Sequence, residues 1–268
     1  MYTIDDLLEV MARLRDPESG CPWDLAQTLK SIVPHTLEEA YEVAETIERD
    51  DSAALCDELG DLLFQIVFYA RIAEEEGDFA FGDVVDAICR KLIRRHPHVF
   101  ADERVSDVAD QTRQWEAHKQ KERAAKQGGR PPGMLDDISL ALPALSRAQK
   151  IQRRAAHVGF DWPDTAGVKA KLAEELAELD EAVEAGRRED IEAEVGDLLF
   201  TCVNLARHLE VDAEAALRGA TRRFARRFAH MEAAAGSGEG LAGLDAEARE
   251  RLWRAAKRGM TEEGRPAP

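Results

Sequence analysis

The sequence contains one long internal repeat, which constrains the fold more than any other feature. Glu38, Glu39, Glu42 and Glu45 recur 136 residues later as Glu174, Glu175, Glu178 and Glu181. At the same offset, the segment ELGDLLF at 58–64 recurs as EVGDLLF at 194–200. Because one shift aligns two separate motifs, the length of chain between them is preserved as well. The sequence therefore predicts two copies of one structural module.

The module is predicted to be all-α, because helix signals dominate and strand signals are nearly absent. The clearest linker, GGRPPG at 128–133, separates a predicted first domain, 1–127, from a second, 134–268. Capping residues and breakers predict helices near 3–15, 36–50, 52–77, 81–95, 106–127, 143–157, 165–185, 188–210, 212–235 and 245–257. The segments 16–34 and 236–243 read as loops, and the second of these as flexible.

The run LLFQIVFYA at 62–70 is apolar on almost every side of a helix. Such a run predicts a central, buried helix. A short helical module cannot surround such a helix by itself. We therefore expect helical bundles that are completed by dimerisation, with a homodimer as the assembly.

Charge and composition exclude several classes of partner. Lys and Arg number 36 against 53 Asp and Glu, a formal net charge of −17. A surface this acidic repels polyphosphate backbones, so no nucleic-acid partner is expected. No apolar run is long enough to span a membrane, and the N-terminal MYTIDDLLEV does not resemble a signal peptide. The four scattered cysteines favour a reducing compartment, so a cytoplasmic location is expected.

The repeated acids are candidate metal ligands, because residues three apart on a helix share a face. Two antiparallel helices could pool four carboxylates in each module: Glu39, Glu42, Glu58 and Asp61 in the first, and Glu175, Glu178, Glu194 and Asp197 in the second. One alternative is that these acids are simply solvated. A second is that Glu39 forms a capping box with Thr36. In the second copy Leu172 replaces that threonine, so Glu175 has no capping role.

A cluster of partly desolvated carboxylates needs cations to neutralise it. No Lys or Arg lies three or four positions from Asp61 or Asp197. Oxygen ligands suit Mg²⁺, with Mn²⁺ as a possible substitute, far better than zinc or copper. A di-iron bundle is a weaker alternative, because it needs Glu-x-x-His where this chain has Glu-x-x-Asp.

Taken together, the motifs resemble the MazG family of nucleoside triphosphate pyrophosphohydrolases, in its two-domain bacterial form. The segments that carry the resemblance span about residues 1–258: CPWDLAQT, EEAYEV, ELGDLLFQIVFYA, KLIRRHPHVF, KIQRRAAHVGFDW and EVGDLLFTCVNLARH. The resemblance implies an all-α, homodimeric enzyme that splits nucleoside triphosphates into monophosphate and pyrophosphate with Mg²⁺. It also implies that the acids named above are the metal ligands. Nucleotide contacts are implied at Lys171, Glu175, Arg223, Arg226, Arg227 and Trp253.

The chemistry of these residue types agrees with that reading. Arginine forks bind phosphate oxygens bidentately, although RFARR at 223–227 could also be a solvated helix face. Trp253 could stack on a base or simply pack. Glu174 is the candidate that orients or deprotonates the attacking water.

The second module offers Lys171 where the first has His35, and RFARR where the first has KLIRR. The fuller set of cations predicts that the second module carries most of the activity, with Lys171 as a second catalytic candidate. A helical dimerisation or regulatory protein that binds metal structurally is the alternative.

Overall fold

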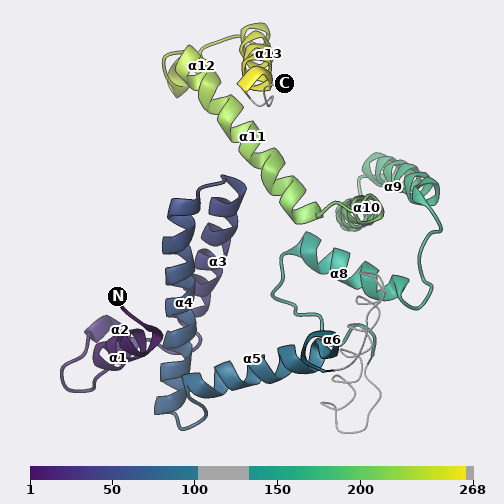
Figure 1. Ribbon diagram of the computed structural model, residues 1–268. Coiled ribbons are helices and arrows are strands. Elements are labelled where there is room, and N and C mark those ends of the chain that lie inside the picture. The colour runs from purple at the N-terminus through teal and green to yellow at the C-terminus, as the bar shows by residue number, and fades with distance from the viewer. Residues whose placement is uncertain (102–132, 264–268) are drawn as a thin grey trace. The chain divides into compact units, whose positions relative to one another are not determined.

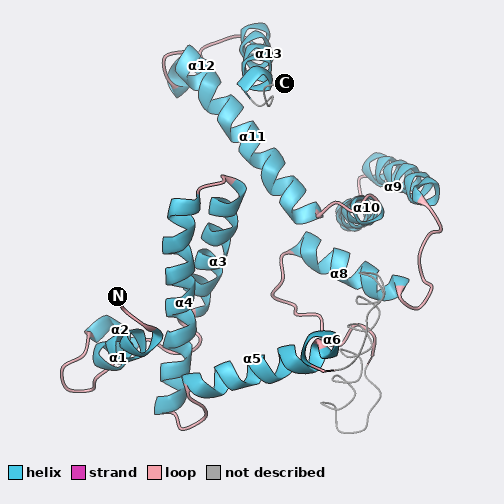
Figure 2. Ribbon diagram, viewed as in Figure 1, coloured by secondary structure: helices cyan, strands magenta, loops and turns pink. Residues whose placement is uncertain are grey.

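The computed structural model describes residues 1–101 and 133–263, and these residues form α-helices joined by loops, with no strand among them (Figures 1 and 2). The all-α prediction is therefore confirmed. The chain divides into two compact units, Met1–Lys126 and Gln127–Pro268. The predicted helix at 106–127 and most of the predicted linker lie outside the described residues. None of the described helices has the length and apolarity needed to cross a membrane.

The first unit is built around a pair of long helices. Its helices are α1 (Ile4–Leu14), α2 (Pro22–Ala26), α3 (Val33–Glu48), α4 (Ser52–Glu75), α5 (Phe81–Arg95) and α6 (Pro97–Phe100). Only three residues separate α3 from α4, so the two pack side by side (Figure 1). Asp51 caps α4 by accepting a hydrogen bond from the backbone N–H of Ala54.

The apolar core of the first unit lies at the C-terminal half of α4. Its buried members come from α1, α4 and the residue before α3: Met11, Ile32, Val67, Phe68 and Ile72. The helix α1 packs against α4 at this core and begins with a capping box, in which Thr3 and Asp6 bond each other's backbone N–H groups. The core therefore anchors one end of the α3–α4 pair, whereas the acids at 58 and 61 belong to the other end of α4.

The second unit repeats this plan and extends it. Its helices are α8 (Ala144–Ala156), α9 (Thr165–Ala185), α10 (Arg188–His208), α11 (Ala213–Ala234), α12 (Gly238–Ala242) and α13 (Ala246–Glu263). The helices α9 and α10 form the pair that corresponds to α3 and α4, joined at Gly186 with φ of 67°. At the far end of α11, α12 and α13 pack through Met231, Leu241 and Ala256 (Figure 1).

Several sequence expectations were wrong. The helix expected near 245–257 continues to Glu263. The helix expected to start at Thr36 already begins at Val33, because Pro34 is tolerated in a first helical turn. The expected loops at 16–34 and 236–243 contain the short helices α2 and α12, and Leu241 of α12 is buried against α11 and α13.

The expectation that the LLFQIVFYA helix is buried all round holds only in part. Within this chain, α4 is buried or half-buried at every position from Val67 to Ala73, and so on all sides of the helix, while Leu59, Leu63 and Ile66 nearer its start remain 37–49% exposed. These three residues form a stripe at i, i+4 and i+7 on one helix face. The described residues of the chain leave this stripe partly exposed.

Candidate metal and nucleotide site

The structure gathers the predicted acids of the first module between the middle of α3 and the N-terminal half of α4. Carboxylate oxygens of Glu39, Glu42 and Glu58 lie within 4.8 Å of one another. The fourth predicted acid, Asp61, is one turn further along α4. The pKa of Glu39 is raised by desolvation first and then by repulsion from Asp61 and Glu42. The four acids therefore form one group, although only three of them converge to ligand distance.

The capping alternative for Glu39 is wrong. Thr36 lies inside α3, where its hydroxyl contacts the Ile32 carbonyl at 3.2 Å and the Tyr69 hydroxyl at 2.8 Å. Glu39 is therefore in the second turn of the helix and has no capping role. Its position is explained by the acid group that it joins.

The second module forms a matching cluster between α9 and α10. Carboxylate oxygens of Glu175, Glu194 and Asp197 lie within 4.8 Å of one another. Glu175 is only 4% exposed, so at least one carboxylate of this cluster is removed from bulk water. Glu178, the fourth predicted acid, acts on Glu194 by repulsion. The two clusters use equivalent helices but not the same three acids.

The electrostatics of both clusters is that of crowded like charges. The pKa of Glu58 is raised by desolvation first and then by repulsion from Glu42 and Asp61. The pKa of Glu194 is raised in the same way, by desolvation and then by repulsion from Glu178, Glu175 and Asp197. A positive charge bound among these acids would relieve both effects.

In the second module, one such charge is supplied by the chain. The ammonium of Lys171 donates a hydrogen bond to Glu174 at 2.7 Å and pairs with Glu175 at 2.9 Å. Glu178 is 3.8 Å away. These hydrogen bonds hold the pKa of Lys171 well above its usual range. Two residues that sequence analysis proposed as catalytic, Lys171 and Glu174, are thus neighbours at the edge of the cluster.

Comparison with known proteins assigns both helix pairs to one family. A profile of the MazG nucleotide pyrophosphohydrolase domain matches residues 27–100 and 165–231. A "Nucleoside triphosphate pyrophosphohydrolase" of Escherichia coli (strain K12) is 51% identical over 261 residues, which are 96% of this chain and 98% of that protein. The chain belongs to the MazG family. Each MazG segment contains one acid cluster, which confirms the predicted duplication.

Two further relatives are also named nucleoside triphosphate pyrophosphohydrolases. The "Nucleoside triphosphate pyrophosphohydrolase/pyrophosphatase MazG" of Thermotoga maritima is 46% identical over 228 residues, 85% of each chain. A "Nucleoside triphosphate pyrophosphohydrolase" of Mycobacterium tuberculosis is 39% identical over 156 residues, which cover 58% of this chain and 46% of that protein. The match to the first two extends beyond either MazG segment alone, as expected for the two-domain type.

The predicted nucleotide contacts of the second MazG segment lie on α11 and α13. Arg223 and Arg226 are exposed, whereas the guanidinium of Arg227 sits 5.8 Å from the centre of the Trp253 ring. The Trp253 ring packs against Phe224 at 5.4 Å and lies 5.3 Å from the Lys257 ammonium. No hydrogen bond or ion pair among the described residues joins these three arginines to the acids of α9 and α10. Their roles toward nucleotide remain predictions.

An ion pair that the sequence did not predict joins the loop before α9 to the end of α10. Arg207, near the end of α10, donates to Asp161 Oδ2 at 2.9 Å, and His208 Nε2 lies 3.0 Å from Asp161 Oδ1. Burial alone would raise the pKa of Asp161, but these two partners lower it overall. The bond ties the loop before α9 to α10. The only sequence signal was the recurrence of Arg71 as Arg207, which does not indicate a partner.

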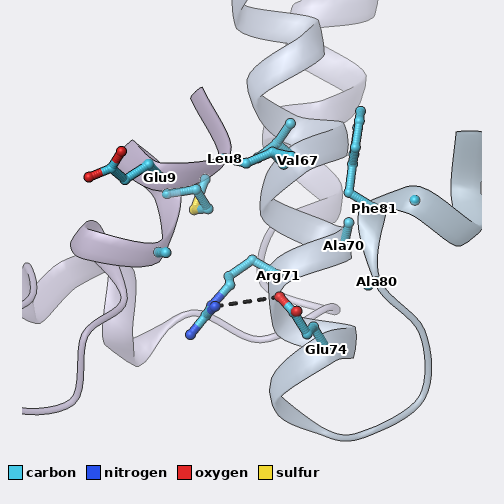
Figure 3. A pocket seen from close by; sticks show the side chains of 11 residues that line it. Leu8, Glu9, Val67, Ala70, Arg71, Glu74, Ala80 and Phe81 are labelled. Atoms are coloured by element: carbon cyan, nitrogen blue, oxygen red, sulfur yellow. Dashed lines mark hydrogen bonds and ion pairs between the residues drawn. The ribbon is translucent and has the colours of Figure 1, made fainter. Parts of the chain in front are cut away.

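The first unit also contains a cavity of about 360 Å³ between α1, α4 and α5 (Figure 3). Its wall is largely apolar, including Leu8, Val67 and Phe81, and Arg71 and Glu74 form a 3.4 Å ion pair at its edge. None of the predicted site residues lines it. The cavity borders the C-terminal half of α4, away from the turn that carries Glu58.

Proposed function

We propose that this nucleoside triphosphate pyrophosphohydrolase is a cytoplasmic, divalent-cation-dependent enzyme that works mainly at the second acid cluster. The reaction releases pyrophosphate and leaves the nucleoside monophosphate, in keeping with nucleotide-pool housekeeping. The observation that carries the proposal is the convergence of Glu175, Glu194 and Asp197 within 4.8 Å in a segment that matches the MazG domain. Triphosphates are strongly anionic, so these acids cannot bind them without a cation between.

The donor set fits Mg²⁺, or Mn²⁺ as its substitute. Both clusters consist of carboxylates alone, without histidine or cysteine. Hard cations prefer oxygen ligands of this kind, whereas zinc and copper favour nitrogen or sulfur. When bound, such a cation neutralises phosphate charge and makes water more acidic at neutral pH. Glu175, Glu178, Glu194 and Asp197 would hold it in the second module, and Glu39, Glu42, Glu58 and Asp61 in the first.

Around that site, the side chains of the chain have distinct roles. Glu174 orients or deprotonates the attacking water, because it stands beside the proposed ligand Glu175 at the edge of the cluster. The water oxygen bonds to the α-phosphorus as the bond from that phosphorus to the bridging oxygen breaks. Lys171 offsets negative charge that gathers on the phosphates. The carboxylate of Glu174 thus acts at the water as it becomes a nucleophile, and the ammonium of Lys171 acts at the phosphates as they gain negative charge.

Arg223, Arg226 and Arg227 are proposed to bind phosphate oxygens, because guanidinium forks match their geometry. The contacts of Trp253 with Phe224 and Arg227 favour a packing role over base stacking. A truncation of Trp253 that raises KM more than it lowers thermal stability would favour contact with the nucleotide. The reverse would favour packing.

A homodimer is proposed to complete both bundles. Leu59, Leu63 and Ile66 of α4 are exposed, and Val195, Leu199 and Cys202 of α10 are exposed at the same three positions of the repeat. An apolar stripe on a central helix is costly in water and is typical of a surface buried by another copy. Light scattering coupled to size exclusion tests this directly, since a monomer at micromolar concentration would contradict it.

Release of products from a panel of nucleoside and deoxynucleoside triphosphates tests the proposed reaction. With Mg²⁺ or Mn²⁺, we expect equal amounts of monophosphate and pyrophosphate, and no turnover after chelation. With Ca²⁺, we expect little turnover, because its longer and looser coordination positions phosphate and water poorly. Release of orthophosphate instead of pyrophosphate would contradict the proposed bond cleavage. Metal binding without turnover would favour the alternative of a helical dimerisation or regulatory protein.

A further inference from the structure

Lys171 lies at the edge of the second acid cluster. Its ammonium lies 2.7 Å from Glu174, 2.9 Å from Glu175 and 3.8 Å from Glu178. Of these, Glu175 belongs to the three acids whose oxygens converge, and it is 4% exposed. A cation carried by the chain is therefore already bound to acids that the proposed function assigns to a metal ion.

This position makes Lys171 and a metal ion competitors. Both are attracted to the same carboxylates, and two positive charges a few ångströms apart repel each other strongly in a partly desolvated setting. The lysine side chain is 32% exposed and carries a long, flexible stem. It can therefore leave the carboxylates without unfolding the helix.

We propose that Lys171 is a tethered cation that neutralises the second cluster until a divalent metal displaces it, and that the displaced ammonium then binds the phosphates of the substrate. The inference rests on the proposed metal site and adds an order of events to it. Metal binding would release the group that binds triphosphate, so the two ligands are coupled through one side chain. Lys171 would thus weaken metal binding by itself and strengthen nucleotide binding once metal is present.

The first module serves as an internal comparison, because His35 stands at the equivalent position. Its Nδ1 is 3.8 Å from Glu38, which is not one of the converging acids, and its ring packs edge-on against Trp23 at 5.8 Å. Among the described residues, no ion pair joins a Lys or Arg to Glu39, Glu42 or Glu58. The coupling is therefore expected in the second module and not in the first.

The first half of the proposal is tested by titrating the full chain with Mn²⁺ in the absence of nucleotide. The electron paramagnetic resonance signal of unbound Mn²⁺ measures how much of the ion is bound. The Glu42→Gln background removes a ligand of the first cluster, so that the second dominates the signal. In this background, Lys171→Met should bind Mn²⁺ about tenfold more tightly, because the competing charge is gone. Lys169→Met is the matched control, since it removes an exposed charge two residues away and should change the affinity less than about twofold.

The second half predicts a change of opposite sign. With Mn²⁺ saturating, a non-hydrolysable triphosphate should bind Lys171→Met about tenfold more weakly than wild type, and Lys169→Met as wild type. A residue with only a structural role would not strengthen one ligand and weaken the other. If Lys171→Met failed to fold, as judged by circular dichroism, the reverse experiment remains. In a Glu178→Gln background, His35→Lys should weaken Mn²⁺ binding at the first cluster.

The proposal is overturned if Lys171→Met leaves Mn²⁺ affinity unchanged or lowers it, or if Lys169→Met has the same effect. It is also overturned if triphosphate affinity does not fall. These results would leave the proposed reaction intact, because pyrophosphate release by the wild type measures that separately. If the wild-type protein bound no Mn²⁺, both the role of Lys171 and the proposed metal-dependent reaction would be contradicted.

Discussion

The two modules share their acids but differ in what surrounds them. In both, acids from a pair of adjacent helices converge within 4.8 Å. In the second, Lys171 sits against the cluster, and α11 carries the three arginines of RFARR. In the first, the equivalent position is His35, directed to Glu38 and Trp23. Under the proposed function, converging acids alone do not make a module active, because a triphosphate also needs fixed cations.

The interiors of the modules differ in a complementary way. Phe68 of α4 is fully buried in an apolar core, whereas Asn204, its equivalent in α10, is 4% exposed and accepts from Arg207 at 2.6 Å. The α8–α10 contact likewise uses Gln152, whose amide donates to the Phe200 carbonyl at 2.8 Å. At these equivalent positions, the first module is therefore held by apolar packing and the second by hydrogen bonds.

The largest expected effect is the loss of a proposed metal-binding acid from the second module. Asp197→Asn should lower turnover by about three orders of magnitude, because one converging carboxylate loses its charge. Thermal stability should stay the same or rise, since Asp197 contributes to the repulsion that raises the pKa of Glu194. Pyrophosphate release and thermal unfolding measure the two effects.

Two variants control that experiment. Glu189→Gln removes an exposed charge from the first turn of the same helix and should behave as wild type. Asp61→Asn is the equivalent change in the first module and should leave most of the turnover. Near-wild-type rates in Asp197→Asn at saturating Mg²⁺ would show that the acids were assigned wrongly.

The second prediction concerns stability. Phe68→Ala should lower the free energy of unfolding of the first unit by about 4 kcal/mol, because it removes a large, fully buried side chain from the apolar core. Asn204→Ala should cost the second unit about 1–2 kcal/mol, because it removes hydrogen bonds rather than apolar volume. Urea unfolding followed by circular dichroism compares them. Equal losses would contradict the difference between the two interiors.

The third prediction is smaller and depends on pH. Arg15 is buried and pairs with Glu75 at 2.7 Å. Burial would raise the pKa of Glu75, but hydrogen bonds from Arg15 and Arg71 lower it below its ordinary value of 4.5. A depressed carboxyl pKa stabilises the folded state above the ordinary pKa, and this stabilisation is lost as the pH falls through the depressed value.

Arg15→Ala should therefore cost about 3 kcal/mol at neutral pH and less below about pH 4. The cost should not vanish in acid, because Arg15 also donates to the Asp24 carbonyl and lies 5.4 Å from the Phe68 ring centre. Urea unfolding at pH 7 and pH 3.5 measures the difference, with Arg13→Ala as an exposed control on the same helix. A cost that is independent of pH would show that the ion pair contributes little.

Much of this fold could be predicted from sequence, because its signals are local or repeated. Periodicity and capping predicted the bounds of α9 correctly, and the 136-residue offset predicted that α3–α4 and α9–α10 are equivalent pairs. The gathering of the acids followed from their three-residue spacing on paired helices. The start of α3 was missed because Thr36 and Glu39 imitate a capping box, while the true first turn contains Pro34.

The remainder depended on contacts between residues that are distant in sequence. The helix α12 was read as a loop because its glycines have low helix propensity, yet Leu241 is buried against α11 and α13. The pairing of Arg207 with Asp161 spans 46 residues, and no local sequence pattern predicts it. The hydrogen bonds of Lys171 to Glu174 and Glu175 could have been read from spacing, since the residues are three and four apart on one helix.

The central claim is that the second module carries most of the activity, and paired charge-neutral variants of the full chain test it most directly. Glu42→Gln and Glu178→Gln make the same change at equivalent positions, so pyrophosphate release at saturating Mg²⁺ compares the modules without separating them. We expect Glu178→Gln to lose at least about a hundredfold in rate, and Glu42→Gln to lose less than about threefold. An inactive Glu42→Gln variant beside an active Glu178→Gln variant would contradict the account and assign the chemistry to the first module.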